Sequence, residues 1–195
     1  MSLKVELVVI FSPSFANTFL VIRHSMKTAH LKTFILFFGF LFFNNCDKKI
    51  EKIERDAGNL YKAEGDDKEL NNAINEAKQN IGIFESALNS NNENLYGFCI
   101  KMRFLTETGG EHIWLCDVFS KKNKLYGIID NVPVSRTDLK LGDTIEIPKS
   151  EISDWMFINK KDSITTGGYT IKVIRNRFTK EEQKIMEKES GIKFE

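Results

Sequence analysis

The residue with the clearest chemical potential is His112, the one histidine after residue 45, within Glu111-His112-Ile113-Trp114. An imidazole titrates near neutrality, so with a carboxylate beside it the ring could act as a general acid or base. Glu111 and Asp154 are the candidate partners, which would make the protein a small hydrolase-type enzyme. In the alternative, His112 hydrogen-bonds Asp154 or a loop carbonyl and holds two parts of a sheet together. Its place on a strand between apolar residues favours this structural role.

Aromatic and polar residues further along the chain could form a binding surface. The tryptophans either pack in a core or line a groove for a peptide or glycan, since aromatic faces suit both roles. The candidate binding residues are Trp114, Trp155, Arg103, Asp143 and Asn131. Packing is the favoured role for the tryptophans.

The sequence predicts no bound metal and no cofactor. Zinc sites typically combine several histidine or cysteine ligands, and one histidine falls short of that. The chain has no phosphate-binding glycine loop, no dinucleotide fingerprint and no Gly-x-Ser-x-Gly elbow. The formal net charge of +1 argues against a nucleic-acid-binding protein, because such domains are usually strongly basic.

A helix should open the domain that carries these residues. Asp66 and Glu69 have capping-box spacing, with Asp in place of the usual Ser or Thr. Apolar residues then recur every three or four positions and form one stripe. They are Leu70, Ala73, Ile74, Ala77, Ile81, Phe84 and Leu88. The pattern predicts one amphipathic helix that ends near residues 89–92 and buries a single face.

Beyond residue 94 the pattern alternates, as expected for strands. The predicted strands are 95–105, 113–119, 124–129, 144–147, 152–159 and 169–175. A second capping box, Thr179 with Glu182, predicts a charged helix that stops at Gly191. We therefore expect an α+β domain in which the first helix packs on a curved antiparallel sheet or half-barrel of about six strands.

The first two strands have one favourable register. If paired residue numbers sum to 215, Ile100 faces Leu115 on an apolar face, and a slip by one would mix apolar and charged residues. This register sets Cys99 opposite Cys116. Opposed strand positions approach the Cα separation that a disulfide needs. The sequence leaves two alternatives open, a disulfide or two buried free thiols.

The N-terminal third predicts export. Residues 26–32 are basic, residues 33–43 are apolar and uncharged, and Cys46 follows. This arrangement is typical of a secretory signal peptide, and the cysteine resembles the lipid-carrying residue of bacterial lipoproteins. The predicted organisation is an upstream over-extension (1–25), a signal peptide (26–45), a charged linker that is in part helical or a simple tether (46–65), and the α+β domain (66–195). The alternatives are that residues 34–43 form a buried core helix or strand, or that the segment is an uncleaved membrane anchor.

The spacing of the motifs resembles the uncharacterised YegJ-like family, DUF2314, from about Asp66 to about Lys193. The resemblance rests on the helix ending near Phe84 and on Glu111-His112-Ile113-Trp114, Gly127, Asn131 with Pro133, Gly142-Asp143, Ile152-Ser153-Asp154-Trp155 and Gly167-Gly168-Tyr169-Thr170. Members often carry a lipoprotein signal, but the resemblance implies no activity. The two strand cysteines are outside this pattern.

Together these features predict a binding or interaction protein of the bacterial cell envelope, held to the membrane by a lipid on Cys46. Its partner would be an envelope protein, a peptide or a glycan, and nucleic acid is not expected. The alternative is the envelope hydrolase that uses His112 with Glu111 or Asp154.

Overall fold

The described part of the chain begins with short segments and becomes continuous from residue 67. The structure is a computed structural model of the 195-residue protein. It describes residues 6–10, 51–53, 60–64, 67–107 and 109–194. The apolar leader at 33–43, Cys46 and Asp66 lie outside these ranges. Among the described helices, none combines the length and apolarity needed to cross a membrane.

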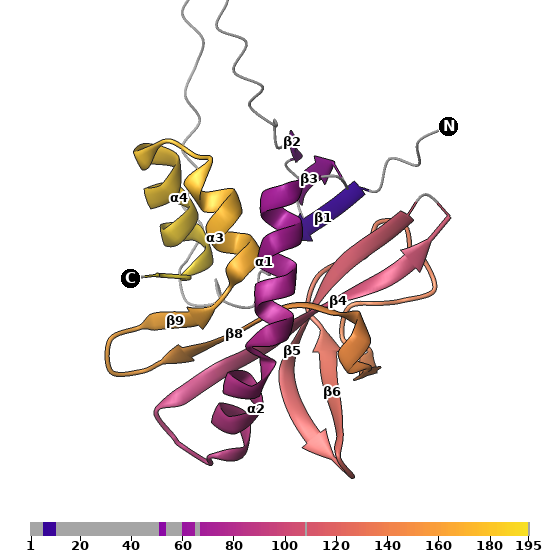
Figure 1. Cartoon of the computed structure of the whole chain (residues 1–195), viewed down its shortest axis with the longest axis vertical. Helices are drawn as coiled ribbons and strands as arrows, with labels where there is room; N and C mark the ends of the chain where they lie inside the picture. The colour runs from indigo at the N-terminus through magenta and orange to yellow at the C-terminus, as the bar shows by residue number, and fades with distance from the viewer. Residues whose placement is uncertain (1–5, 11–50, 54–59, 65–66, 108, 195) are drawn as a thin grey trace, which may run out of the picture.

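A six-stranded antiparallel sheet forms the centre of the domain (Figure 1). Its strands are β4 (Leu95–Thr106), β5 (Gly109–Lys121), β6 (Lys124–Ile129), β7 (Thr144–Ile147), β8 (Ile152–Asn159) and β9 (Ile164–Gly167). They lie in the order β7-β6-β5-β4-β8-β9, and every pair is antiparallel. A 3-10 turn, η2 (Lys149–Glu151), leads into β8. The sheet is open and does not close into a barrel. The predicted α+β class with about six strands is confirmed.

The opening helix is divided into two. Helix α1 (Lys68–Gln79) and helix α2 (Ile81–Asn89) meet at Asn80, whose φ of −98° and ψ of 9° are not helical. The Asn80 side chain donates to the carbonyl of Glu76 at 3.0 Å, which offers the backbone an alternative to helix continuation. The N-cap is Asp67, one residue later than predicted, and its Oδ1 accepts from the backbone N–H of Leu70 at 3.2 Å.

The predicted strand at 169–175 is wrong, because this segment is helix α3 (Tyr169–Asn176). Its buried residues, Thr170, Ile171 and Ile174, recur with helical spacing. The prediction had instead interpreted the segment as an alternating strand pattern. Gly168 lies just before the helix with a φ of 64°, a left-handed conformation that suits glycine. The sixth strand is instead β9, immediately upstream.

Two separate apolar clusters hold helices against the two faces of the sheet. The larger joins α1 and α2 to one face, through residues such as Ala77, Phe84 and Trp155. The smaller includes Ile171 of α3 and Met186 of α4 (Lys180–Ser190). The capping box of Thr179 with Glu182 and the stop at Gly191 are present in α4, as predicted.

The predicted register of the β4–β5 hairpin is confirmed. Ile100 pairs with Leu115 and Met102 with Ile113, so the paired numbers sum to 215. The Cys99 and Cys116 sulfur atoms lie 2.11 Å apart in a disulfide that belongs to the smaller cluster. The bond joins β4 to β5 across the face that α3 and α4 cover.

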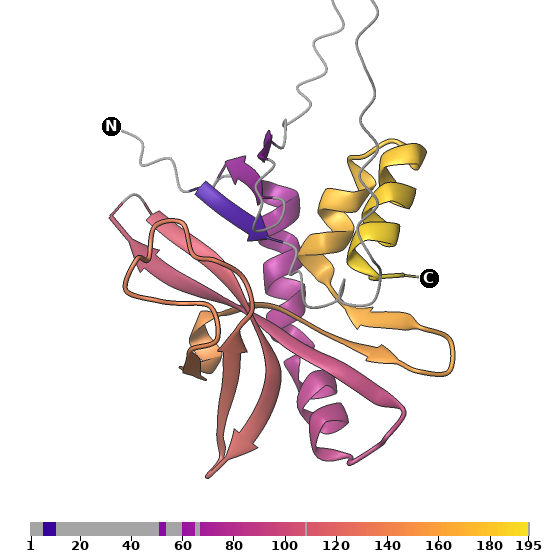
Figure 2. The same ribbon diagram turned by 180° about the vertical axis from the view of Figure 1, so that it is seen from behind.

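A small second sheet lies upstream of the domain. Its strands are β1 (Glu6–Ile10), β2 (Glu51–Ile53) and β3 (Leu60–Glu64), in the order β1-β3-β2. The stretch predicted as a charged, partly helical linker therefore contains two short strands. Strand β1 contacts β5, and Figures 1 and 2 both place it beside the β4–β5 hairpin.

Candidate functional site

His112 is buried on β5 and bonded to a serine. Its side chain is 5% exposed, and its Nδ1 lies 2.7 Å from the Oγ of Ser153. That hydroxyl donates its one hydrogen to the carbonyl of Lys101 at 3.2 Å, so the imidazole Nδ1–H is the donor to Ser153. The β4–β8 register shifts between Lys101 and Met102, which leaves Ser153 as an extra residue in β8. Such a bulge re-aims a side chain, here toward the imidazole.

The surroundings of His112 disfavour its charged form. Burial, together with the positive charges of Lys101, Arg103 and Lys78, lowers the pKa of His112 to about 3. A general base works best with a pKa near the working pH. The hydrogen bond of this neutral ring goes to Ser153 rather than to Asp154, the carboxylate suggested by the sequence.

We expect His112 to make the protein less stable in acid. Its pKa is about 6.5 when unfolded and about 3 when folded. As the pH falls through this interval the unfolded chain binds the proton first, so the free energy of unfolding decreases, by up to about 1.4 kcal/mol per pH unit. His112→Gln retains a donor to Ser153 and cannot titrate. Denaturant unfolding between pH 7 and pH 3 should give a shallower decline for this variant, and parallel curves would contradict the assignment.

Asp154 is fully buried, and its carboxylate accepts hydrogen bonds from the chain around it. Its Oδ1 accepts from the backbone N–H of Trp155 at 2.8 Å and of Tyr169 at 3.0 Å. Its Oδ2 accepts from the backbone N–H of Thr170 at 2.8 Å and from the Thr170 hydroxyl. The carboxylate thus satisfies the first N–H groups of α3, where a negative charge is stabilised by the helix dipole. Asp154 fastens α3 to the sheet.

A buried lysine completes this network. Lys101 pairs with Asp154 across β4 and β8, and its Nζ donates to the Thr170 hydroxyl. The ammonium lies 4.9 Å from the centre of the Trp114 ring, within the range of a cation–π interaction. Burial lowers the pKa of Lys101 to about 8, against the opposing effect of Asp154. The lysine is therefore mostly charged at neutral pH and depends on Asp154 for compensation.

Glu111, the other candidate acid, holds a loop in place. Its side chain is 1% exposed, and its carboxylate accepts from three backbone N–H groups. The donors are Val134 at 2.6 Å, Ser135 at 2.9 Å and Arg136 at 3.3 Å. The loop at residues 130–143, between β6 and β7, is thereby fixed against β5.

The proposed binding residues divide by exposure. Trp114 and Trp155 are 1% and 0% exposed, so they pack in the core and do not line a groove. Asn131 is also buried, and its Oδ1 accepts from the backbone N–H of Trp114 at 2.8 Å. Arg103 and Asp143 are partly exposed, and the Asp143 carboxylate accepts from the N–H of Lys140 at 2.9 Å.

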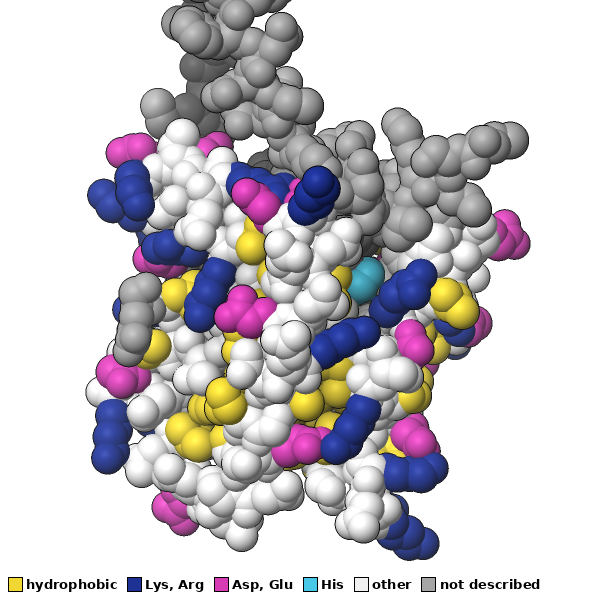
Figure 3. Space-filling model, viewed as in Figure 1, with side chains coloured by type: hydrophobic (Ala, Val, Ile, Leu, Met, Phe, Trp, Pro, Cys, Tyr) yellow, Lys and Arg dark blue, Asp and Glu magenta, His cyan; other side chains and the backbone are white. Residues whose placement is uncertain are grey.

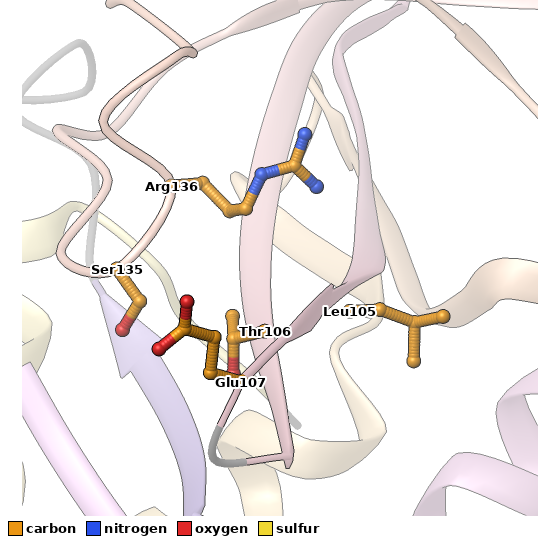
Figure 4. Close-up of a pocket in the computed structure, with 5 residues that line it drawn as sticks. All are labelled: Leu105, Thr106, Glu107, Ser135 and Arg136. Carbon is orange, nitrogen blue, oxygen red and sulfur yellow. The ribbon is translucent and has the colours of Figure 1, made fainter.

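A surface hollow lies where the clamped loop approaches the end of β4. Its volume is about 590 Å³, and it is lined by Leu105, Thr106, Glu107, Ser135 and Arg136. In Figure 4 the Glu107 carboxylate extends toward Ser135, while Leu105 lies on the other side of the strand end. Leu105 is 68% exposed. We name this set of five residues the hairpin–loop hollow.

Arg136 is held rigidly at the rim of the hollow. Its guanidinium makes a bidentate pair with Asp138 at 2.7 and 2.6 Å and lies 5.5 Å from the Phe104 ring centre. No sequence motif marks this region, so the hollow was not among the predicted sites. An apolar Leu105 beside a turn and a long loop after Asn131 were the available signals.

The surface charge is mixed. Figure 3 shows basic and acidic side chains interspersed over the face in view, with no broad region of one sign. Within the described residues, no three His, Cys, Asp or Glu side chains gather as a metal site. The fold and site define an open-sheet α+β domain whose buried polar residues fasten a helix and a loop to the sheet.

The similarity of this chain to known proteins identifies its family. The model of DUF2314, described as an uncharacterised protein conserved in bacteria, matches residues 67–194, and the chain belongs to this family. It is 32% identical to the uncharacterised protein YegJ of Escherichia coli over 117 residues, 60% of this chain and 74% of YegJ. It is 34% identical to a putative ankyrin repeat protein of Neisseria meningitidis over 84 residues, 43% of this chain and 32% of that protein. The chain thus spans about a third of the ankyrin relative. No solved structure matches.

Proposed function

We propose that the protein is a binding module of the bacterial cell envelope, exported through the signal at 26–45 and anchored by a lipid on Cys46. The observation that carries the binding role is the Glu111 clamp. A buried carboxylate fixes the backbone of residues 134–136, which presents Ser135 and Arg136 beside the exposed Leu105. A preorganised surface loses little conformational entropy when it binds.

The hydrolase alternative fits the geometry less well. It needs an imidazole that substrate can reach, with a carboxylate beside it. His112 is 5% exposed and bonds Ser153, and the hydrogen bonds of Glu111 and Asp154 go to loop and helix backbone.

The binding surface is tested with a matched pair of variants. Leu105→Asp alters the hairpin–loop hollow, and Ile185→Asp alters an apolar residue of similar exposure on α4. Both are compared with wild type by cross-linking in envelope membranes and quantitative mass spectrometry. We expect the main cross-linked partner to fall about tenfold for Leu105→Asp, as for a modest hot spot, and to remain for Ile185→Asp. Equal cross-linking by all three proteins would refute this surface.

Export is tested through two sets of cysteines. Radiolabelled fatty acid should label the wild type and not Cys46→Ala. In an oxidising compartment, Cys99 and Cys116 should resist alkylation until a reductant is added, because disulfides persist there. A soluble cytoplasmic product with freely alkylated Cys99 and Cys116 is the outcome that would overturn export.

A further inference from the structure

Strand β1 occupies a position that the exported protein would leave empty. It pairs antiparallel with β3 over five residue pairs, from Glu6 with Glu64 to Ile10 with Leu60, and it also contacts β5. Cleavage before Cys46 removes β1 whether translation starts at Met1 or Met26. The strands β2 and β3, at 51–53 and 60–64, remain in the processed chain.

Loss of β1 would leave an incomplete sheet. Strand β2 pairs with only three residues of β3, from Glu51 with Lys62 to Ile53 with Leu60. A two-stranded ribbon of this kind is marginally stable in water, and three strands packed on another surface are the usual minimum. The exposed edge of β3 would also carry unpaired N–H and C=O groups, which readily accept another strand.

We propose that this edge of β3, which β1 now covers while contacting β5, is an acceptor for an extended apolar segment of a partner protein, which takes the place of β1. Strand β1 indicates the chemistry that fits. Its sequence is Glu-Leu-Val-Val-Ile, four apolar residues of which three are β-branched, and such residues favour strands. Backbone pairing with β3 would provide affinity, as in other cases of β-strand addition.

The acceptor is distinct from the hairpin–loop hollow. Leu105 remains 68% exposed with β1 in place, so a strand at the position of β1 leaves that side chain largely uncovered. The inference goes beyond the proposed function and relies on the proposed export only for the removal of β1. The peptide-binding test of the acceptor does not require export, so its outcome can be told apart from the outcome of the export test.

The test uses the full chain with a site-specific protease sequence inserted after Ser25, between β1 and β2. After cleavage and removal of the N-terminal fragment, a fluorescent peptide of residues 4–12 is added and anisotropy is measured. We expect saturable binding in a ratio of one to one. The uncut chain should bind at least about tenfold more weakly, because its own β1 competes at high effective concentration.

Two controls separate strand pairing from nonspecific apolar contact. The peptide with Val8→Pro should bind about tenfold more weakly, since proline is poorly tolerated inside a paired strand. The cut chain with Leu105→Asp should bind the wild-type peptide as well as the cut chain without it. Absence of binding to the cut chain, equal binding of the proline peptide, or self-association of the cut chain in place of peptide binding would each overturn the proposal.

Discussion

Asp154→Ala is expected to lower the free energy of unfolding by about 3–5 kcal/mol, the usual cost of leaving a buried charge without its compensating group. The carboxylate is fully buried, and the variant would leave the first N–H groups of α3 without their acceptor. It would also leave the buried ammonium of Lys101 without compensation. Urea unfolding followed by tryptophan fluorescence gives the change.

The matched control for Asp154 is Asp138→Ala. Asp138 also accepts hydrogen bonds from its partner, Arg136, but it is exposed, and exposed ion pairs contribute little to stability. Lys101→Met in the Asp154→Ala background should recover part of the lost stability, because it removes the unpaired charge. If Asp154→Ala costs no more than Asp138→Ala, the network does not hold α3 to the sheet.

Trp155→Ala is expected to cost about 3–5 kcal/mol, as for other buried aromatic truncations. The ring is 0% exposed and lies 5.8 Å from Phe84 and 5.5 Å from Tyr169, measured between ring centres. Its Nε1 donates to the carbonyl of Ala77 in α1 at 2.8 Å. The variant would therefore open a cavity at the junction of α1, α3 and β8. Thermal unfolding and denaturant titration give the measurement.

Trp155→Phe separates packing from the hydrogen bond. It keeps an aromatic ring and loses the N–H, so its cost should lie well below that of the alanine variant. Phe119→Ala serves as the surface comparison, because Phe119 is 41% exposed and stacks on Tyr126 in the β5–β6 hairpin. A loss for Trp155→Ala as small as that for Phe119→Ala would contradict a central role for the indole.

The β4–β5 hairpin was predictable because its alternation has one register that keeps Ile100, Met102, Ile113 and Leu115 on one face. The error at 169–175 has a physical reason. The buried positions of α3 were too few to reveal a helical period, and the helix depends on Asp154, which lies fifteen residues earlier. A local pattern cannot contain that long-range cap.

The long-range contacts of the candidate site were likewise not predictable from local sequence patterns. The sequence drew attention to Glu111, His112 and Asp154 because their side chains can do chemistry. Their partners became known only from the fold: a loop backbone for Glu111, a bulged Ser153 for His112 and a helix end for Asp154. A bulge of one residue in β8 leaves no sign in the alternation, so no spacing rule would have joined His112 to Ser153.

The bond between Cys99 and Cys116 also has a consequence for how a newly made chain folds. Its cysteines are seventeen residues apart and belong to neighbouring strands, so the loop that they close is short and forms early. A shift of the hairpin by one residue would turn one sulfur to the opposite side of the sheet. Oxidation therefore selects chains whose hairpin is already aligned, and formation of this bond acts as a proofreading step for the domain.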